Sequence, residues 1–215
     1  MRKLIFIIVL IAIAATGAYS QGFSMSAGGG ALFDWNFDNG MEYGNNRYMV
    51  EDLMAFGGFL FFDVTYAEVE VNFTYGIRTL VTNSRGPLIT ESNGNFMGLG
   101  FSLLGKFPFS LGKVKLFPLL GGDYYLVLSE EKKSTNIIDV THSASTHNQI
   151  GLLAGVGLDT IFTDQLFLRT EALFHFRLPS KFWTEVSNDK DIVSLGKTTF
   201  GMGPKIKVGL GFRFF

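Results

Sequence analysis

The clearest pattern in the chain is an alternation of apolar and polar residues with a period of two. In residues 65–75, Val69 and Val71 fall on one face, while Glu68 and Glu70 fall on the other. Residues 165–178 repeat the pattern, with arginine, glutamate and histidine opposite leucine, alanine and phenylalanine. Successive side chains of a β-strand point to opposite faces, so each stretch predicts a strand with one apolar and one polar face.

Eight segments of the chain have this character or are apolar runs of similar length. They cover residues 22–34, 53–63, 65–76, 96–107, 113–128, 149–161, 165–178 and 200–214. Long polar connections at 35–52, 77–95, 129–148 and 179–199 alternate with short ones at 63–64, 107–112 and 162–164. Tight turns on one side and long loops on the other are typical of barrels that span a bacterial outer membrane. We therefore predict an all-β fold, a closed antiparallel eight-stranded up-and-down transmembrane β-barrel with both termini on the short-turn side.

Alternation alone does not decide which face is inside. A lipocalin-like barrel also has eight strands, but it is soluble and turns its apolar face inward. Here the last predicted strand runs to the end of the sequence, and residues 53–62 and 150–158 have almost no polar face. After residue 20 no apolar stretch is long enough for a spanning helix, so a membrane-crossing chain must form a closed barrel. These features favour apolar side chains turned toward lipid.

The N-terminus has the layout of a cleavable secretory signal peptide. A short basic start is followed by an apolar run at residues 4–15 and by the small residues Ala18 and Ser20. The alternative is a retained anchor, which the shortness of the run disfavours. We predict cleavage after Ser20, so residues 1–20 are a signal peptide and residues 21–215 form one outer-membrane β-barrel domain.

Composition adds three constraints. The chain has no cysteine, so an exported protein would lack disulfides, and its formal net charge of −1 gives no indication of nucleic-acid binding. It contains 23 phenylalanines and 26 glycines, which suggests that glycines make room for large rings on neighbouring strands. Aromatic residues cluster near the strand ends, and we expect two interfacial girdles, with Phe61 and Phe167 near the short turns and Tyr125 near the long loops.

The last strand carries a more specific signal, formed by Lys207, Gly209, Phe212 and Phe214. This pattern resembles the C-terminal assembly signal of bacterial outer-membrane barrel proteins, although Phe215 follows the matched positions. The whole predicted plan is similar to that of the small OmpA/OmpX-type barrels. The resemblance implies an outer-membrane location, recognition by the barrel-assembly machinery and contact with outer-membrane lipid, and we expect a monomer.

The polar faces of three predicted strands carry charges that would point into the barrel. They are Glu68, Glu70, Arg169, Glu171, His175, Arg177, Lys205, Lys207 and Arg213. An eight-stranded barrel leaves an interior just wide enough for side chains, and buried charges must pair. We predict a lumen filled by a carboxylate–guanidinium network that links the third strand to the seventh and eighth. The alternative is a polar conduit.

Other candidate sites are weaker. His142, Ser143 and His147 could be compared with a hydrolase triad, but one loop holds all three. Asp34 begins a pattern like a calcium loop, yet the required glycine falls one place late and Asn45 stands where a glutamate is needed. We expect no cofactor, no metal site and no enzymatic activity.

The predicted function is therefore structural or surface-binding, with an extracellular ligand held by the loops. Transport of small, hydrophobic molecules is the first alternative; it predicts an apolar cavity near the outer mouth, or a lateral gap beside the glycine-rich first and sixth strands. An outer-membrane lipid-modifying enzyme is the second alternative.

Overall fold

The computed structural model describes residues 24–38, 41–43, 46–84, 89–133, 149–178 and 201–214. They form the strands β1 (Met25–Asp38), β2 (Met41–Tyr43), β3 (Asn46–Val64), β4 (Ala67–Ser84), β5 (Ile89–Lys106), β6 (Phe109–Leu111), β7 (Val114–Lys133), β8 (Gln149–Ile161), β9 (Leu166–Arg177) and β10 (Gly201–Arg213). No helix in these ranges is long and apolar enough to cross a membrane. The predicted signal peptide lies outside the described residues.

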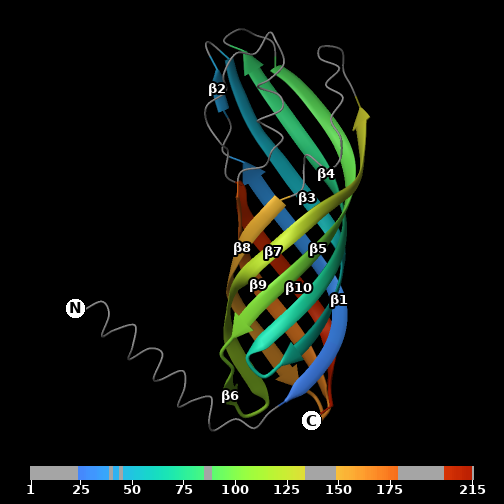
Figure 1. Ribbon diagram of the computed structural model, residues 1–215, viewed down its shortest axis with the longest axis vertical. Coiled ribbons are helices and arrows are strands. Elements are labelled where there is room, and N and C mark those ends of the chain that lie inside the picture. Colours follow the sequence, from blue (N-terminus) through green and yellow to red (C-terminus); the bar gives the residue numbers. More distant parts are fainter. Residues whose placement is uncertain are drawn as a thin grey trace, which may run out of the picture.

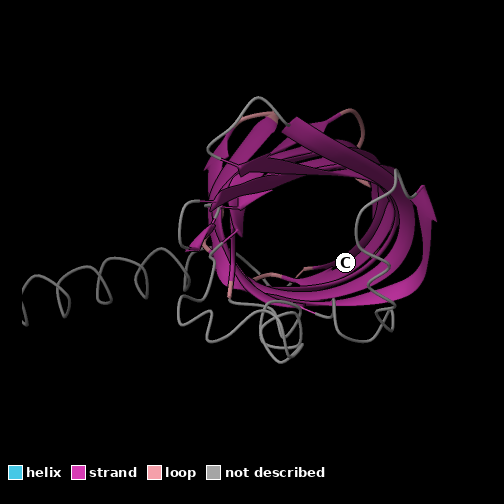
Figure 2. Ribbon diagram, turned by 90° about the horizontal axis from the view of Figure 1, so that it is seen from above, coloured by secondary structure: helices cyan, strands magenta, loops and turns pink. Residues whose placement is uncertain are grey.

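Eight of the strands close into an antiparallel barrel (Figures 1 and 2). Their order around the barrel is β1, β10, β9, β8, β7, β5, β4 and β3, and β3 pairs again with β1. The short strands β2 and β6 lie beside β3 and β7, respectively. The prediction of a closed eight-stranded up-and-down barrel is confirmed.

The short turns all lie at one end of the barrel, which we call the lower rim. They are the turn at Thr65 and Tyr66, the turn at Gly112 and Lys113 below β6, and residues 162–165. Gly112 has φ of +66°, a conformation that glycine adopts without strain. The N–H of Phe214 donates to the carbonyl of Met25 at 2.9 Å, so β1 begins and β10 ends at this same rim.

One half of the barrel wall is taller than the other. Strands β3, β4, β5 and β7 have 19, 18, 18 and 20 residues, whereas β8, β9, β10 and β1 have 12 to 14. The tall strands project past the short ones at the upper rim (Figure 1). The predicted loops at 35–52 and 77–95 are therefore wrong over much of their length. The sequence there mixes polar and apolar residues without a period of two, so the alternation fades although strand pairing continues.

The direction of the side chains confirms the predicted sidedness. Val69 and Ile206 face outward with 52% and 46% exposure, while Glu70 and Arg169 face the lumen with 0% and 1%. Three aromatic residues assigned to the girdles, namely Phe61, Phe167 and Tyr125, are instead buried inside the barrel. They share the parity of the lumen-facing residues on their strands.

We expect a charge on the outer face to destabilise the barrel according to its depth. Leu60 lies on the outer face of β3 and Leu111 lies in β6 at the lower rim, and both are 68% exposed. In a lipid-embedded barrel, Leu60→Arg should cost about 2–4 kcal/mol and Leu111→Arg about 0–1 kcal/mol. Urea unfolding in lipid vesicles, followed by heat-modifiable gel mobility, measures both. Equal stability of the two variants would contradict an outer face in hydrocarbon.

Candidate functional site

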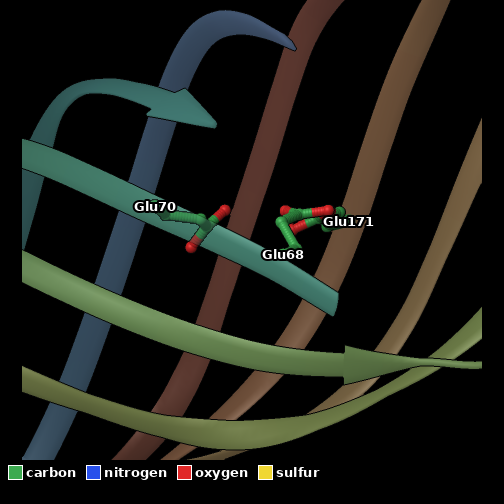
Figure 3. A group of neighbouring side chains, drawn as sticks. All are labelled: Glu68, Glu70 and Glu171. Atoms are coloured by element: carbon green, nitrogen blue, oxygen red, sulfur yellow. The ribbon is translucent and has the colours of Figure 1, made fainter. Parts of the chain in front are cut away.

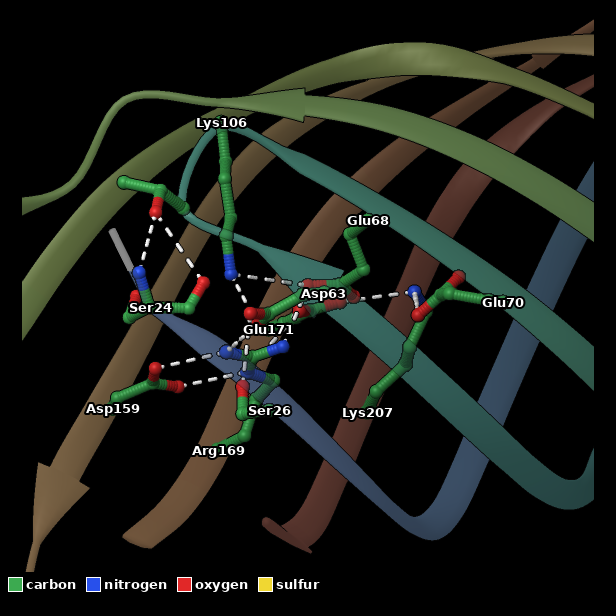
Figure 4. Close-up of polar contacts among 11 residues, drawn as sticks. Ser24, Ser26, Asp63, Glu68, Glu70, Lys106, Asp159, Arg169, Glu171 and Lys207 are labelled. Carbon is green, nitrogen blue, oxygen red and sulfur yellow. Dashed lines mark hydrogen bonds and ion pairs between the residues drawn. The ribbon is translucent and has the colours of Figure 1, made fainter. Parts of the chain in front are cut away.

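The lower half of the lumen is organised around the guanidinium of Arg169, which projects from β9 (Figure 4). Its Nη1 donates to Glu68 Oε2 at 2.6 Å, and its Nη2 donates to Asp63 Oδ2 at 2.6 Å. Its Nε donates to Asp159 Oδ1 at 2.8 Å. Arg169 is 1% exposed, so water does not solvate its guanidinium. Three carboxylates, from β3, β4 and β8, balance its charge and accept its hydrogen bonds.

Lys106, at the end of β5, joins the same group. Its Nζ donates to Asp63 Oδ2 and lies 3.6 Å from Glu68 Oε2. Ser26 of β1 also donates its hydroxyl to Asp63 Oδ1 at 2.8 Å. We call Asp63, Glu68, Lys106, Asp159 and Arg169 the lower ion cluster. It ties together strands that lie on opposite sides of the barrel.

Aromatic rings enclose the guanidinium of Arg169. The Cζ of Arg169 lies 4.2 Å from the centre of the Phe61 ring, 5.1 Å from that of Phe167 and 5.3 Å from that of Phe117. A guanidinium in this range of aromatic faces gains cation–π attraction, and the rings fill the space that water would otherwise occupy. The rings fit because small residues lie opposite them. A Cβ on Gly157 would lie 2.1 Å from the Phe117 ring.

Above this group, Lys207 of β10 lies between two glutamates. Its Nζ donates to Glu70 Oε1 at 2.5 Å and to Glu171 Oε2 at 2.9 Å. All three side chains have 0% exposure. Arg169 Nε lies 3.9 Å from Glu171 Oε1, which places this middle ion cluster of Glu70, Glu171 and Lys207 directly beside the lower one.

The upper ion cluster contains Asp34, Asp123, His175, Arg177 and Lys205. The imidazole of His175 lies between two carboxylates, with Nε2 at 3.0 Å from Asp123 and Nδ1 at 3.6 Å from Asp34. Lys205 lies 3.9 Å from Asp123, and Arg177 lies 3.5 Å from Asp34. The three clusters together occupy successive levels of the lumen.

The structure brings together most of the residues predicted to face the lumen. Glu68, Glu70, Arg169, Glu171, His175, Arg177, Lys205 and Lys207 are all buried there. Arg213 differs from them: it is half-buried at the lower rim, and its guanidinium lies 5.9 Å from the centre of the Phe167 ring. Among the described residues it forms no ion pair.

Sequence reasoning missed five members of the clusters, namely Asp34, Asp63, Lys106, Asp123 and Asp159. Asp34, which begins the pattern like a calcium loop, lies within β1 and is 3% exposed in the lumen. Asp63 and Asp159 follow runs in which both strand faces are apolar. Without alternation in those runs, no signal in the sequence indicated which parity faces the lumen. The residues His142, Ser143 and His147 lie outside the described ranges.

This arrangement can close the lumen and fix the strands relative to one another. Burying an ion costs several kcal/mol unless a partner and hydrogen bonds compensate for lost hydration. Each charged side chain in the three clusters lies within 4.0 Å of an opposite charge. We call the three clusters with their surrounding rings the lumen plug.

Removal of the central cation should destabilise the barrel strongly. Arg169→Met leaves three buried carboxylates without their shared guanidinium, and breaking a buried pair costs about 3–5 kcal/mol. Lys113→Met, at an exposed turn position, is the matched control and should stay within about 0.5 kcal/mol of wild type. Urea unfolding midpoints in lipid vesicles give both values. Wild-type stability of Arg169→Met would show that the network contributes little.

The fold is similar to those of solved bacterial outer-membrane proteins. Outer membrane protein OprG from Pseudomonas aeruginosa aligns with a TM-score of 0.55 and 12% identity, covering 90% of this chain and 97% of that one. Neisserial surface protein A aligns with a TM-score of 0.46 and 12% identity, covering 90% and 100%. No protein-family model and no curated protein matches the sequence. The OprG match shows that this chain has the fold of a small eight-stranded outer-membrane β-barrel protein.

Proposed function

We propose that the protein is an integral barrel of a bacterial outer membrane, with a closed lumen and a structural or surface-binding role. The observation that carries this proposal is the lumen plug. Glu68, Arg169 and Glu171, from opposite walls, are 0%, 1% and 0% exposed. An eight-stranded barrel has no room for a water channel beside such side chains. With the lumen closed, any binding partner contacts the outer surface or the rims of the barrel.

The outer surface supports the membrane location. Leu60, Leu120, Ile150 and Leu152 are between 54% and 68% exposed, and they belong to a much larger set of outward apolar side chains around the barrel. Soluble proteins rarely expose apolar patches of more than a few hundred Å². Together with the similarity of fold, this surface favours outer-membrane lipid as the main partner of a monomer.

The last strand supports the proposed role of the barrel-assembly machinery. Phe212 and Phe214 face outward with 43% and 48% exposure, and their rings meet edge to face at 5.6 Å. Lys207 faces the lumen instead. A Cβ on Gly209 would lie 2.7 Å from the carbonyl oxygen of Gly29, so this position needs glycine where β10 meets β1. Of the four matched residues, Phe212 and Phe214 therefore face outward, Lys207 faces the lumen, and Gly209 packs closely against β1.

The strand ladders do not favour the transport alternative. The predicted place for a lateral gap was beside the glycine-rich first and sixth strands. Within the described residues, β1 is paired with β10 from Ser26 to Asp34 and with β3 from Met25 to Phe37. β8 is paired with both β7 and β9. A ligand is therefore more easily accommodated at the upper rim, where the tall strands project.

We expect the purified protein to form no steady, large channel in a planar bilayer, because the lumen plug blocks the axis. An open porin in the same bilayer is the control. Replacing residues 136–146 by a short Gly-Ser linker should leave heat-modifiable mobility unchanged, since the described strands β7 and β8 end at Lys133 and begin at Gln149. A steady conductance from the wild-type protein would exclude a closed lumen and favour transport.

We also expect Phe214→Ala to separate assembly from stability. The variant loses one outward ring at the rim, so its refolding into detergent micelles should remain near wild type. Its assembly in cells should fall several-fold if the machinery recognises that ring. The folded fraction in isolated outer membranes, compared with the in vitro fraction, measures the difference. Deletion of Phe215 is the control, because it leaves the four matched residues intact. Equal assembly of Phe214→Ala and wild type would refute the signal.

A further inference from the structure

The middle of the lumen holds three glutamates in close contact. Glu68 and Glu70 project from β4, and Glu171 projects from β9 on the opposite wall (Figure 3). One carboxylate oxygen from each lies within 4.8 Å of the others, and all three residues are fully buried. Ionised carboxylates repel one another at this range, and burial strengthens the repulsion, so their negative charge must be compensated.

Each of these glutamates has one oxygen that accepts a hydrogen bond from a basic side chain and one buried oxygen that has no hydrogen-bond partner. Arg169 binds Glu68 Oε2, while Lys207 binds Glu70 Oε1 and Glu171 Oε2. Within the described part of the chain, Glu68 Oε1, Glu70 Oε2 and Glu171 Oε1 are buried without a hydrogen-bond partner. Arg169 Nε, at 3.9 Å from Glu171 Oε1, is too far for a hydrogen bond. Buried polar atoms in folded proteins are nearly always satisfied, so an unpartnered oxygen on each of three neighbouring carboxylates indicates a missing ligand.

The charge balance leads to the same conclusion independently. The lower and middle ion clusters contain five carboxylates, on Asp63, Glu68, Glu70, Asp159 and Glu171, but only three basic groups, on Lys106, Arg169 and Lys207. They therefore carry an excess of two negative charges if all are ionised. Lys115 and Arg213 are half-buried at the lower rim and form no ion pair with this group in the described ranges. One divalent cation would remove the excess.

We propose that Glu68, Glu70 and Glu171 hold one divalent cation of the oxygen-preferring class, Mg²⁺ or Ca²⁺, inside the barrel. Ca²⁺ binds oxygen at about 2.3–2.6 Å, so oxygens on opposite sides of it lie up to about 5 Å apart, whereas the corresponding limit for Mg²⁺, at about 2.1 Å, is about 4 Å. The three glutamate oxygens lie within 4.8 Å of one another and are therefore within the limit for Ca²⁺. Lys207 and Arg169 each engage one oxygen of the carboxylates that they contact, so every one of the three glutamates keeps one oxygen without a hydrogen-bond partner. The enclosed position means that the ion enters while the barrel folds.

The test is the metal content of full-length mature protein refolded in micelles with MgCl₂ and CaCl₂ and passed through gel filtration. Wild type should retain about one more divalent ion per chain than Glu171→Gln or Glu70→Gln. Asp123→Asn is the matched control, because it removes a buried carboxylate from the upper ion cluster only. It should keep the ion. Equal metal content in wild type and both glutamine variants would overturn the proposal.

A second measurement on wild type alone covers the case in which the variants do not fold. Protein refolded with Mg²⁺ and Ca²⁺ should unfold at a temperature roughly 5–10 °C higher than protein refolded in EDTA, because the ion binds only the folded state. The infrared carbonyl band of a protonated carboxylic acid should be absent from the cation-loaded form. Equal unfolding temperatures, together with that band in both preparations, would show that protons balance the charge and that no cation is bound.

Discussion

The closed hydrogen-bond ladder is the constraint from which the other features follow. A chain in hydrocarbon must satisfy every backbone N–H and C=O internally, and a β-sheet does so only when it has no free edge. Here β1 completes the ring by pairing with both β10 and β3. Closure with eight strands fixes a narrow interior. The narrow interior forces the charges on the inner face into contact, and their burial requires that they pair.

The sequence allowed the sidedness to be predicted but not the strand ends. Glu68 and Glu70 alternate with Val69 and Val71, and that contrast exists because one face meets lipid and the other meets charges. In the upper parts of β4 and β5 polar and apolar residues follow one another without a period of two, so the sequence there looked like a loop. Aromatic residues suit either face, so Phe61 could not be assigned to the lumen from its type alone.

The sequence predicted which residues belong to the ion clusters better than it predicted which of them contact one another. Charges on β4, β9 and β10 were evident because apolar neighbours flank them. Asp63 and Asp159 were not, since they follow runs with two apolar faces. Which groups meet depends on which strands lie opposite each other and on the tilt of the barrel. Glu70 and Glu171 are 101 positions apart in the chain, and only the closed ring places both against Lys207.

Charges in the lumen also explain why the strands adopt one register. A slip of one residue would turn every side chain of a strand to the opposite face. For β10, such a slip would move Lys205 and Lys207 into lipid, at about 2–4 kcal/mol for each charge near the midplane. It would also leave Glu70 and Glu171 without their cation. A lumen of leucines would impose no such penalty, because apolar side chains suit both faces. Replacement of a buried ion pair by apolar residues is often neutral for stability. We therefore infer that the main contribution of the lumen plug is to the uniqueness of the fold.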